Sequence, residues 1–191
     1  MKTKLLVFLL MMSVCAGLAA QNSNVEKRVQ LAREKYPERL NLISTVKMYE
    51  RDEIPNVNYL TVVRRQNWAG SGQSVDKAEY YYSEVEKEFE PHPVGYTLMI
   101  VRRTYNVGSQ DFFEEYVYDD EGNPLFWFTR YGYSKEAQIE LRGYFSADGT
   151  LVRSLAKGTD DKSEIKRAFA KAKKHFGLFK KTFQSLYDVE Y

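Results

Sequence analysis

The chain has 191 residues, and its 28 lysines and arginines nearly balance its 26 aspartates and glutamates. This balance lacks the strong positive charge that marks nucleic-acid-binding proteins, so we expect no nucleic-acid partner. Hydrophobic residues make up 43% of the chain and aromatic residues 15%, a composition that suits one folded domain with a substantial core.

The beginning of the chain has the three parts of a secretory signal peptide in the required order. A basic start precedes an unbroken apolar run at 5–12, and a small-residue cleavage site follows at 16–20. We therefore predict that 1–20 is a signal peptide cleaved near Ala20, and that 21–191 forms a single α+β domain, secreted or periplasmic. The apolar run is too short to span a bilayer, and no later stretch is long enough, so we expect no membrane span.

The predicted leader also carries the chain's only cysteine. Cys15 would be lost on cleavage, which leaves the mature chain without material for a disulfide or for thiol chemistry. A lipoprotein signal is the alternative for this cysteine. Such a signal would place a small residue before the cysteine, whereas Val14 stands there. The leader contains two lysines and no acidic residue, so the mature chain has a formal charge of zero.

The first mature segment is predicted to be helical, because its apolar residues recur every three to four positions. This stripe consists of Val25, Val29, Ala32 and Tyr36. We expect Pro37 to break or bend the helix. A second helical stretch should then start with this proline in its first turn and continue the stripe through Leu40, Ile43 and Val46.

The composition of 56–156 predicts a run of strands, because tyrosine and other aromatic residues are concentrated there. The predicted strands span 57–65, 77–89, 96–105, 112–118, 125–133, 138–145 and 150–155. Strands this close in sequence pair antiparallel. An acidic residue followed by Gly122 or by Gly149 supplies the positive backbone angle that a tight hairpin needs.

The last segment has the clearest pattern in the sequence, because seven apolar side chains fall on one helical stripe. They are Ile165, Phe169, Ala172, Phe176, Phe179, Phe183 and Leu186. Thr159 or Asp160 is expected to cap the start of this helix. Gly177 lies inside the pattern and is expected to bend or end it.

These elements together predict an α+β fold. Its sheet is an antiparallel meander of six to seven strands, and the N-terminal and C-terminal helices are packed on one face of it. Laying both helical stripes across the same face is the simplest way to bury them.

Several of these features together resemble uncharacterised secreted proteins of gut-type bacteria. They are the N-terminal helix, an Asn-x-x-Gly-x-Gly loop at 67–72, the aromatic segment at 79–82, a Tyr-x-x-x-Gly-x-x-Leu hairpin at 118–125 and the C-terminal helix. The resemblance covers most of the mature chain and implies the same arrangement of helix, strands and helix. It implies no activity and assigns no catalytic residue.

Candidates for metal and acid–base chemistry are few. His92 lies in a Pro-His-Pro turn, and His175 lies beside the stripe of the last helix. Because the sequence has no His-x-x-x-His spacing, we predict no metal site and no cofactor. The acidic segment 119–123 resembles a calcium loop only faintly and favours a hairpin.

A row of glutamates alternates along one predicted strand, so its members share one side of it. They are Glu84, Glu86, Glu88 and Glu90. We expect this row to be solvated or paired with arginines, with a calcium site or an acid and base pair as the alternative.

Basic residues also form two patterns. The arginine pairs at 64–65 and 102–103 must face opposite sides of their strands, so we expect them at strand ends or paired with carboxylates, with an anion site as the alternative. The lysines of the last helix are expected on its solvated outer face, with docking to an anionic membrane or to nucleic acid as the alternative.

The strand at 125–133 carries large aromatic residues in both of its alternating sets. Its second face therefore needs a covering layer, or it presents a platform on which a sugar ring or a peptide can stack. We predict a partly exposed ligand-binding surface that includes Trp68, Trp127 and Tyr131.

The sequence accordingly predicts a non-enzymatic domain that binds a glycan, a peptide or a protein partner through this aromatic sheet surface. The alternative is a carboxylate-dependent hydrolase of envelope or dietary polymers, using Glu86 and Glu88 with or without His92. A purely structural partner of a larger complex is the third possibility.

Overall fold

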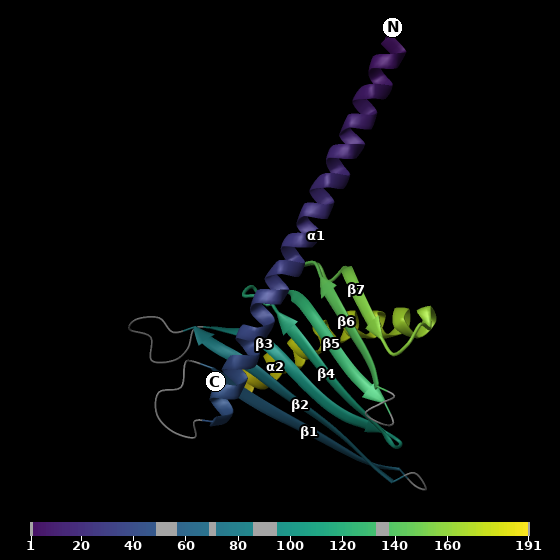
Figure 1. Ribbon diagram of the computed structural model, residues 1–191. Coiled ribbons are helices and arrows are strands. Elements are labelled where there is room, and N and C mark those ends of the chain that lie inside the picture. The colour runs from purple at the N-terminus through teal and green to yellow at the C-terminus, as the bar shows by residue number, and fades with distance from the viewer. Residues whose placement is uncertain (1, 49–56, 69–71, 86–94, 133–137, 191) are drawn as a thin grey trace.

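The computed structural model describes residues 2–48, 57–68, 72–85, 95–132 and 138–190. Within these residues, a long helix α1 (Lys2–Met48) precedes seven strands, and a second helix α2 (Lys162–Glu190) follows them (Figure 1). The strands are β1 (Asn58–Trp68), β2 (Gly72–Val85), β3 (Gly95–Val107), β4 (Gln110–Tyr118), β5 (Pro124–Gly132), β6 (Gln138–Phe145) and β7 (Leu151–Lys157).

The strands form one sheet in the order β1-β2-β3-β4-β5-β6-β7, and every neighbouring pair is antiparallel. The predicted α+β class and the predicted meander are confirmed. The hairpin at 119–123 closes as the acid-glycine pattern requires, since Gly122 has a φ of 73° and Asp119 donates its backbone N–H to the Asn123 carbonyl.

The two helices cover opposite faces of the sheet. The α2-side core includes Tyr116, Trp127 and Phe176, whereas the α1-side core includes Val29 and Val117. Figure 1 shows α1 crossing in front of the strands while α2 runs behind them. The prediction that both helices pack on one face is therefore wrong. Because aromatic side chains point to both sides of the sheet, each face needs a covering layer of its own.

Helix α1 is continuous through Pro37, so the predicted break is also wrong. Contacts on both sides of the proline hold the helix to the sheet. Tyr36 donates its hydroxyl to Glu115, and Arg39 donates to Asp120 at 2.5 Å. These contacts stabilise a helical course that the missing N–H of proline disfavours.

One arginine joins α1 to the ends of the central strands. The Arg28 guanidinium donates to Asp119 Oδ2 at 2.8 Å and to the carbonyls of Pro124 at 2.6 Å and Phe145 at 2.8 Å. Asp119 also accepts the backbone N–H groups of Glu121 and Asn123, so its carboxylate belongs to the hairpin and to this ion pair.

Helix α2 buries the predicted stripe with one change. Phe169, Phe176 and Phe183 are buried, as predicted, but Leu186 is 36% exposed and Tyr187 takes the inner position instead. A period of 3.6 residues per turn places the residue four beyond Phe183 over the sheet at this point. Gly177 lies on the outer side of α2 and neither ends nor interrupts the helix.

The predicted signal peptide coincides with the part of α1 that projects beyond the sheet in Figure 1. Among the described residues, no helix combines the length and the hydropathy that crossing a membrane requires. Cleavage and export stay predictions.

Candidate ligand-binding pocket

The three residues predicted to bind a ligand lie in different settings. The backbone of Trp68 ends β1, but its side chain lies outside the described residues. Trp127 is 2% exposed, and its ring packs edge-on against Phe169 of α2 at a centroid distance of 5.3 Å. The expectation that Trp127 is exposed is therefore wrong, because α2 covers its face of the sheet. Tyr131 is half-buried on the same face, nearer the end of β5.

Cross-strand pairing brings side chains from four strands into rows on the face that α2 covers. The row nearest the β3–β4 turn contains Asp76, Tyr105, Phe112 and Tyr131, the next contains Arg103, Glu114 and Thr129, and the third contains Tyr116 and Trp127.

A cavity of about 430 Å³ lies between the first half of α2 and these rows. We call it the helix–sheet pocket. Its lining residues are Tyr105, Gln110, Phe112, Glu114, Trp127, Thr129, Tyr131, Ile139, Glu164, Ala168 and Lys171. The volume is within the range of small-ligand sites, and the lining combines aromatic walls with a few polar groups, as such sites do. Two of the predicted residues, Trp127 and Tyr131, thus meet in one cavity.

The aromatic row forms one wall of the pocket. Phe112 stacks on Tyr105 at 4.7 Å and on Tyr131 at 5.1 Å, with interplanar angles of 5° and 19°. The rings therefore cover one another's faces and turn their edges away from the sheet. This geometry does not offer Phe112 as an open platform for a sugar ring, so recognition here depends on polar groups and ring edges.

Glu114 is the polar centre of the pocket. Its side chain is 4% exposed, and its carboxylate accepts hydrogen bonds from Tyr105 at 3.2 Å, Tyr116 at 2.9 Å and Arg103 at 3.3 Å. Burial, together with the charge of Glu114, raises the pKa of both tyrosine hydroxyls, so they stay donors. Arg103 also holds Asp76 through two bonds of 2.8 Å. A buried carboxylate needs such partners to offset its lost hydration.

His175 of α2 extends this network. Its Nδ1 lies 3.0 Å from the Tyr116 hydroxyl, and burial lowers its pKa to about 4 despite the opposing effect of Glu114. The ring is therefore neutral at pH 7. Because Tyr116 donates its proton to Glu114, His175 donates from Nδ1 to the tyrosine oxygen, which assigns its tautomer.

Charged groups of α2 stand at the other side of the pocket. Lys171 Nζ donates to the Tyr105 hydroxyl at 2.9 Å, lies 5.0 Å from the centroid of that ring, and lies 3.8 Å from Glu114 Oε1. Glu164 accepts the hydroxyl of Tyr131 at 2.7 Å and that of Thr159 at 3.1 Å. Burial, with the contribution of Glu164, raises the pKa of Tyr131.

One polar group of the lining is left without a protein partner. The indole Nε1 of Trp127 is buried and forms no hydrogen bond with any described residue. It approaches the Tyr116 hydroxyl and lowers the pKa of that group, but without hydrogen-bond geometry. An unpaired buried N–H costs about 1–3 kcal/mol, and because this atom is closed to solvent, an acceptor reaches it only when a side chain of the pocket wall moves.

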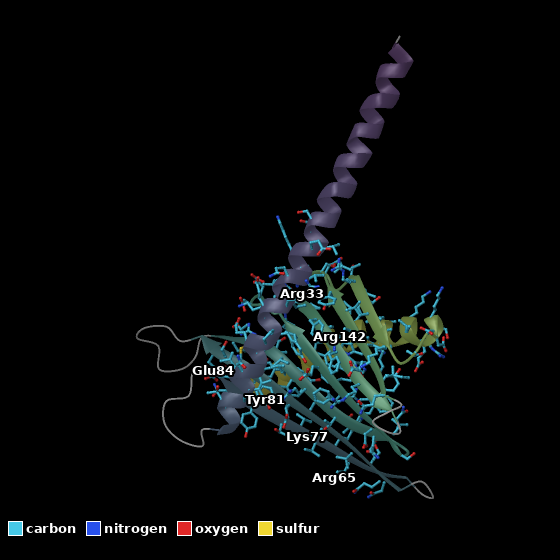
Figure 2. All side chains as sticks on the ribbon, in the orientation of Figure 1. Arg33, Arg65, Lys77, Tyr81, Glu84 and Arg142 are labelled. Atoms are coloured by element: carbon cyan, nitrogen blue, oxygen red, sulfur yellow. The ribbon has the colours of Figure 1, made fainter. Side chains whose placement is uncertain are left out.

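The opposite face of the sheet carries aromatic residues beside α1. Phe113 lies 5.7 Å from the guanidinium carbons of both Arg102 and Arg130, and Phe128 lies 5.7 Å from that of Arg142. Figure 2 shows Arg142 on the area that α1 leaves uncovered. A hollow of about 640 Å³ at the end of the sheet adjoins Phe113 and Arg130 of this face and also Tyr105, Phe112 and Tyr131 of the other face. Arginines already lie over these rings, so the helix–sheet pocket is the stronger candidate site.

Arg64, Arg102 and Arg103 are each partnered with carboxylates, as expected. Arg102 donates to Glu115 at 2.8 Å on the α1 face, and Arg103 donates to Glu114 and Asp76 on the α2 face. The sequence holds a signal that we missed, because a β3–β4 hairpin closed at 107–110 places Arg102 opposite Glu115 and Arg103 opposite Glu114.

The other acidic candidates lie elsewhere. Glu86, Glu88, Glu90 and His92 lie outside the described residues, while Glu84 accepts the Tyr187 hydroxyl at 3.4 Å. Among the described residues, no group of three histidine, cysteine, aspartate or glutamate side chains is placed to hold a metal ion.

Comparison with known proteins adds no assignment. The chain matches no protein-family model, no curated protein and no solved structure. The resemblance to uncharacterised secreted proteins of gut-type bacteria therefore stays a prediction.

Proposed function

We propose that this protein is a non-enzymatic binding domain, exported after cleavage near Ala20, that holds one polar group of a peptide or glycan in the helix–sheet pocket. The unpartnered Trp127 N–H carries the proposal. Trp127 lines the cavity, so a ligand whose acceptor atom displaces the side chain covering this donor stabilises the fold.

The state of Glu114 favours binding over catalysis. Three donors fix its carboxylate in one position, and the neutral ring of His175 points its Nδ1 proton back into the same network. A general base needs a free lone pair within reach of the substrate proton. These groups satisfy one another, so they serve as a rigid wall.

A ligand screen tests this proposal. NMR spectra of the mature protein, recorded with short peptides and oligosaccharides, should show shifts concentrated at the Trp127 indole N–H and around Tyr131. Tyr131→Ala should weaken binding by about tenfold, as expected for an aromatic side chain that lines a site. Tyr59→Ala is the matched control, because Tyr59 is exposed on β1 and does not line the pocket.

Chromatography of the same mixtures distinguishes the alternative function. Binding without product supports the proposal, whereas release of hydrolysis products would favour the carboxylate-dependent hydrolase. In that case Glu114 and Glu164 would be the first residues to replace, because both line the pocket.

A further inference from the structure

We propose that the group held in the helix–sheet pocket is a primary ammonium, carried by an amino sugar or by a peptide amine. This inference rests on the proposed function and specifies the chemistry of its ligand.

The lining of the pocket is negatively charged overall. Glu114 and Glu164 contribute two carboxylates, and Lys171 contributes the only ammonium among the residues that line it. Arg103, behind this lining, is already held by two bonds to Asp76. Arg103 also donates to Glu114, so the carboxylate of the lining that forms no ion pair with any described residue is Glu164, and a cation that enters the pocket meets it in a partly water-excluded space, where attraction between charges is stronger than in bulk water.

Lys171 shows how the pocket accommodates an ammonium. Its Nζ lies over the ring of Tyr105, donates to the hydroxyl of that ring and stands beside Glu114. The Lys171 side chain is 48% exposed and reaches the pocket from the surface of α2. A ligand ammonium can take the same three contacts while the lysine turns out to solvent. Lys171 thus competes with the ligand for these three contacts.

A second anchor completes the site. The Trp127 N–H can donate to a hydroxyl of an amino sugar or to a carbonyl of a peptide, both of which stand a few bonds from the amine. Glu164 is a further acceptor at the rim of the pocket, where its carboxylate also binds two hydroxyl donors. The pocket therefore fits a group that pairs a cation with a nearby oxygen.

The experiment uses two amines and the N-acetylated form of each. The probes are a glucosamine trisaccharide and triglycine with a free amino terminus, titrated into the mature protein by calorimetry at about pH 6.5, where an α-amine is protonated. Each free amine is expected to bind at least about tenfold more tightly than its acetylated form, since acetylation removes the charge. Comparison of the two amines identifies the source of the ammonium.

Three substitutions test the position of the ammonium. Lys171→Met should tighten binding of the free amine by about fivefold or more, because it removes the competing cation, and Glu164→Gln should weaken it by a similar factor. Lys174→Met is the matched control, since Lys174 is exposed on α2 and does not line the pocket. It should change the affinity by less than about twofold.

The outcomes separate this inference from the proposed function. Equal binding of free and acetylated probes, with shifts at Trp127, would overturn the ammonium inference and leave the binding pocket standing. Weaker amine binding in Lys171→Met would also overturn it. If neither amine shifts the NMR signal of the Trp127 indole N–H but another peptide or oligosaccharide does, the ammonium inference fails and the proposed binding function stands. If no ligand shifts that signal, both proposals fail.

Discussion

Replacement of Phe176 by alanine tests the packing of α2 against the sheet. The Phe176 side chain is 1% exposed, and the rings of Tyr116, Tyr118 and Phe145 meet it edge-on at centroid distances of 5.2 Å. Large-to-small changes at such positions cost about 3–5 kcal/mol. Three aromatic contacts, each contributing about 0.5–1.5 kcal/mol beyond the buried area, place Phe176→Ala in the upper half of that range.

Urea unfolding followed by circular dichroism measures this loss. A decrease of about 4 kcal/mol is a large share of the free energy of unfolding of an ordinary domain, about 5–15 kcal/mol. The urea concentration at the midpoint of unfolding should therefore be much lower for the variant. Lys173→Ala, on the exposed side of the same helix, should change the free energy of unfolding by less than about 0.5 kcal/mol.

A small effect would refute the reasoning. If Phe176→Ala lowered the free energy of unfolding by less than about 1 kcal/mol, the ring would not lie in a close-packed core. If the same variant kept its stability and lost binding to anionic vesicles, docking of α2 to a membrane would replace the packing described above.

Three further predictions concern processing, the α1 anchor and pH. Mass spectrometry of the native protein should find a chain that begins at or near Gln21, and an intact Met1 in most molecules would contradict this. Arg28→Met should lower the free energy of unfolding by about 2–4 kcal/mol, because it leaves the buried Asp119 carboxylate without its cation. Arg33→Met, on an exposed site of α1, should cost less than about 0.5 kcal/mol, and equal losses in the two variants would exclude the anchor. Burial lowers the pKa of His175 from 6.5 to about 4 in the folded protein. Between these two pH values the unfolded chain binds one more proton than the folded protein, so the free energy of unfolding decreases as the pH drops from about 6.5 to about 4. His175→Gln should reduce this fall by about 1–2 kcal/mol in denaturant unfolding at several pH values, whereas an unchanged pH profile would contradict the assigned burial.

Local patterns in the sequence determined the elements of this fold. The concentration of tyrosine and other aromatic residues in 56–156 indicated the run of strands, and the three-to-four spacing from Ile165 onward located α2. Such patterns are readable because each depends on neighbours within a few residues and on the fixed periods of strand and helix. The continuity of α1 was not readable, since contacts of Tyr36 and Arg39 with distant residues outweigh the local preference of Pro37.

Only the tertiary structure decided which face each helix covers and which polar groups meet. The sequence marked Trp127 and Tyr131 as neighbours on one face of β5, but not that α2 would bury the first and close a pocket over the second. The network of Glu114 depends on the register of β3 and β4 and on where α2 crosses them. A shift of one residue would exchange Glu114 with Glu115 and move the carboxylate to the opposite face. The tight β3–β4 hairpin fixes this register locally, whereas the place where α2 crosses the strands is set by the packing of the whole sheet, because no local pattern of residues specifies it.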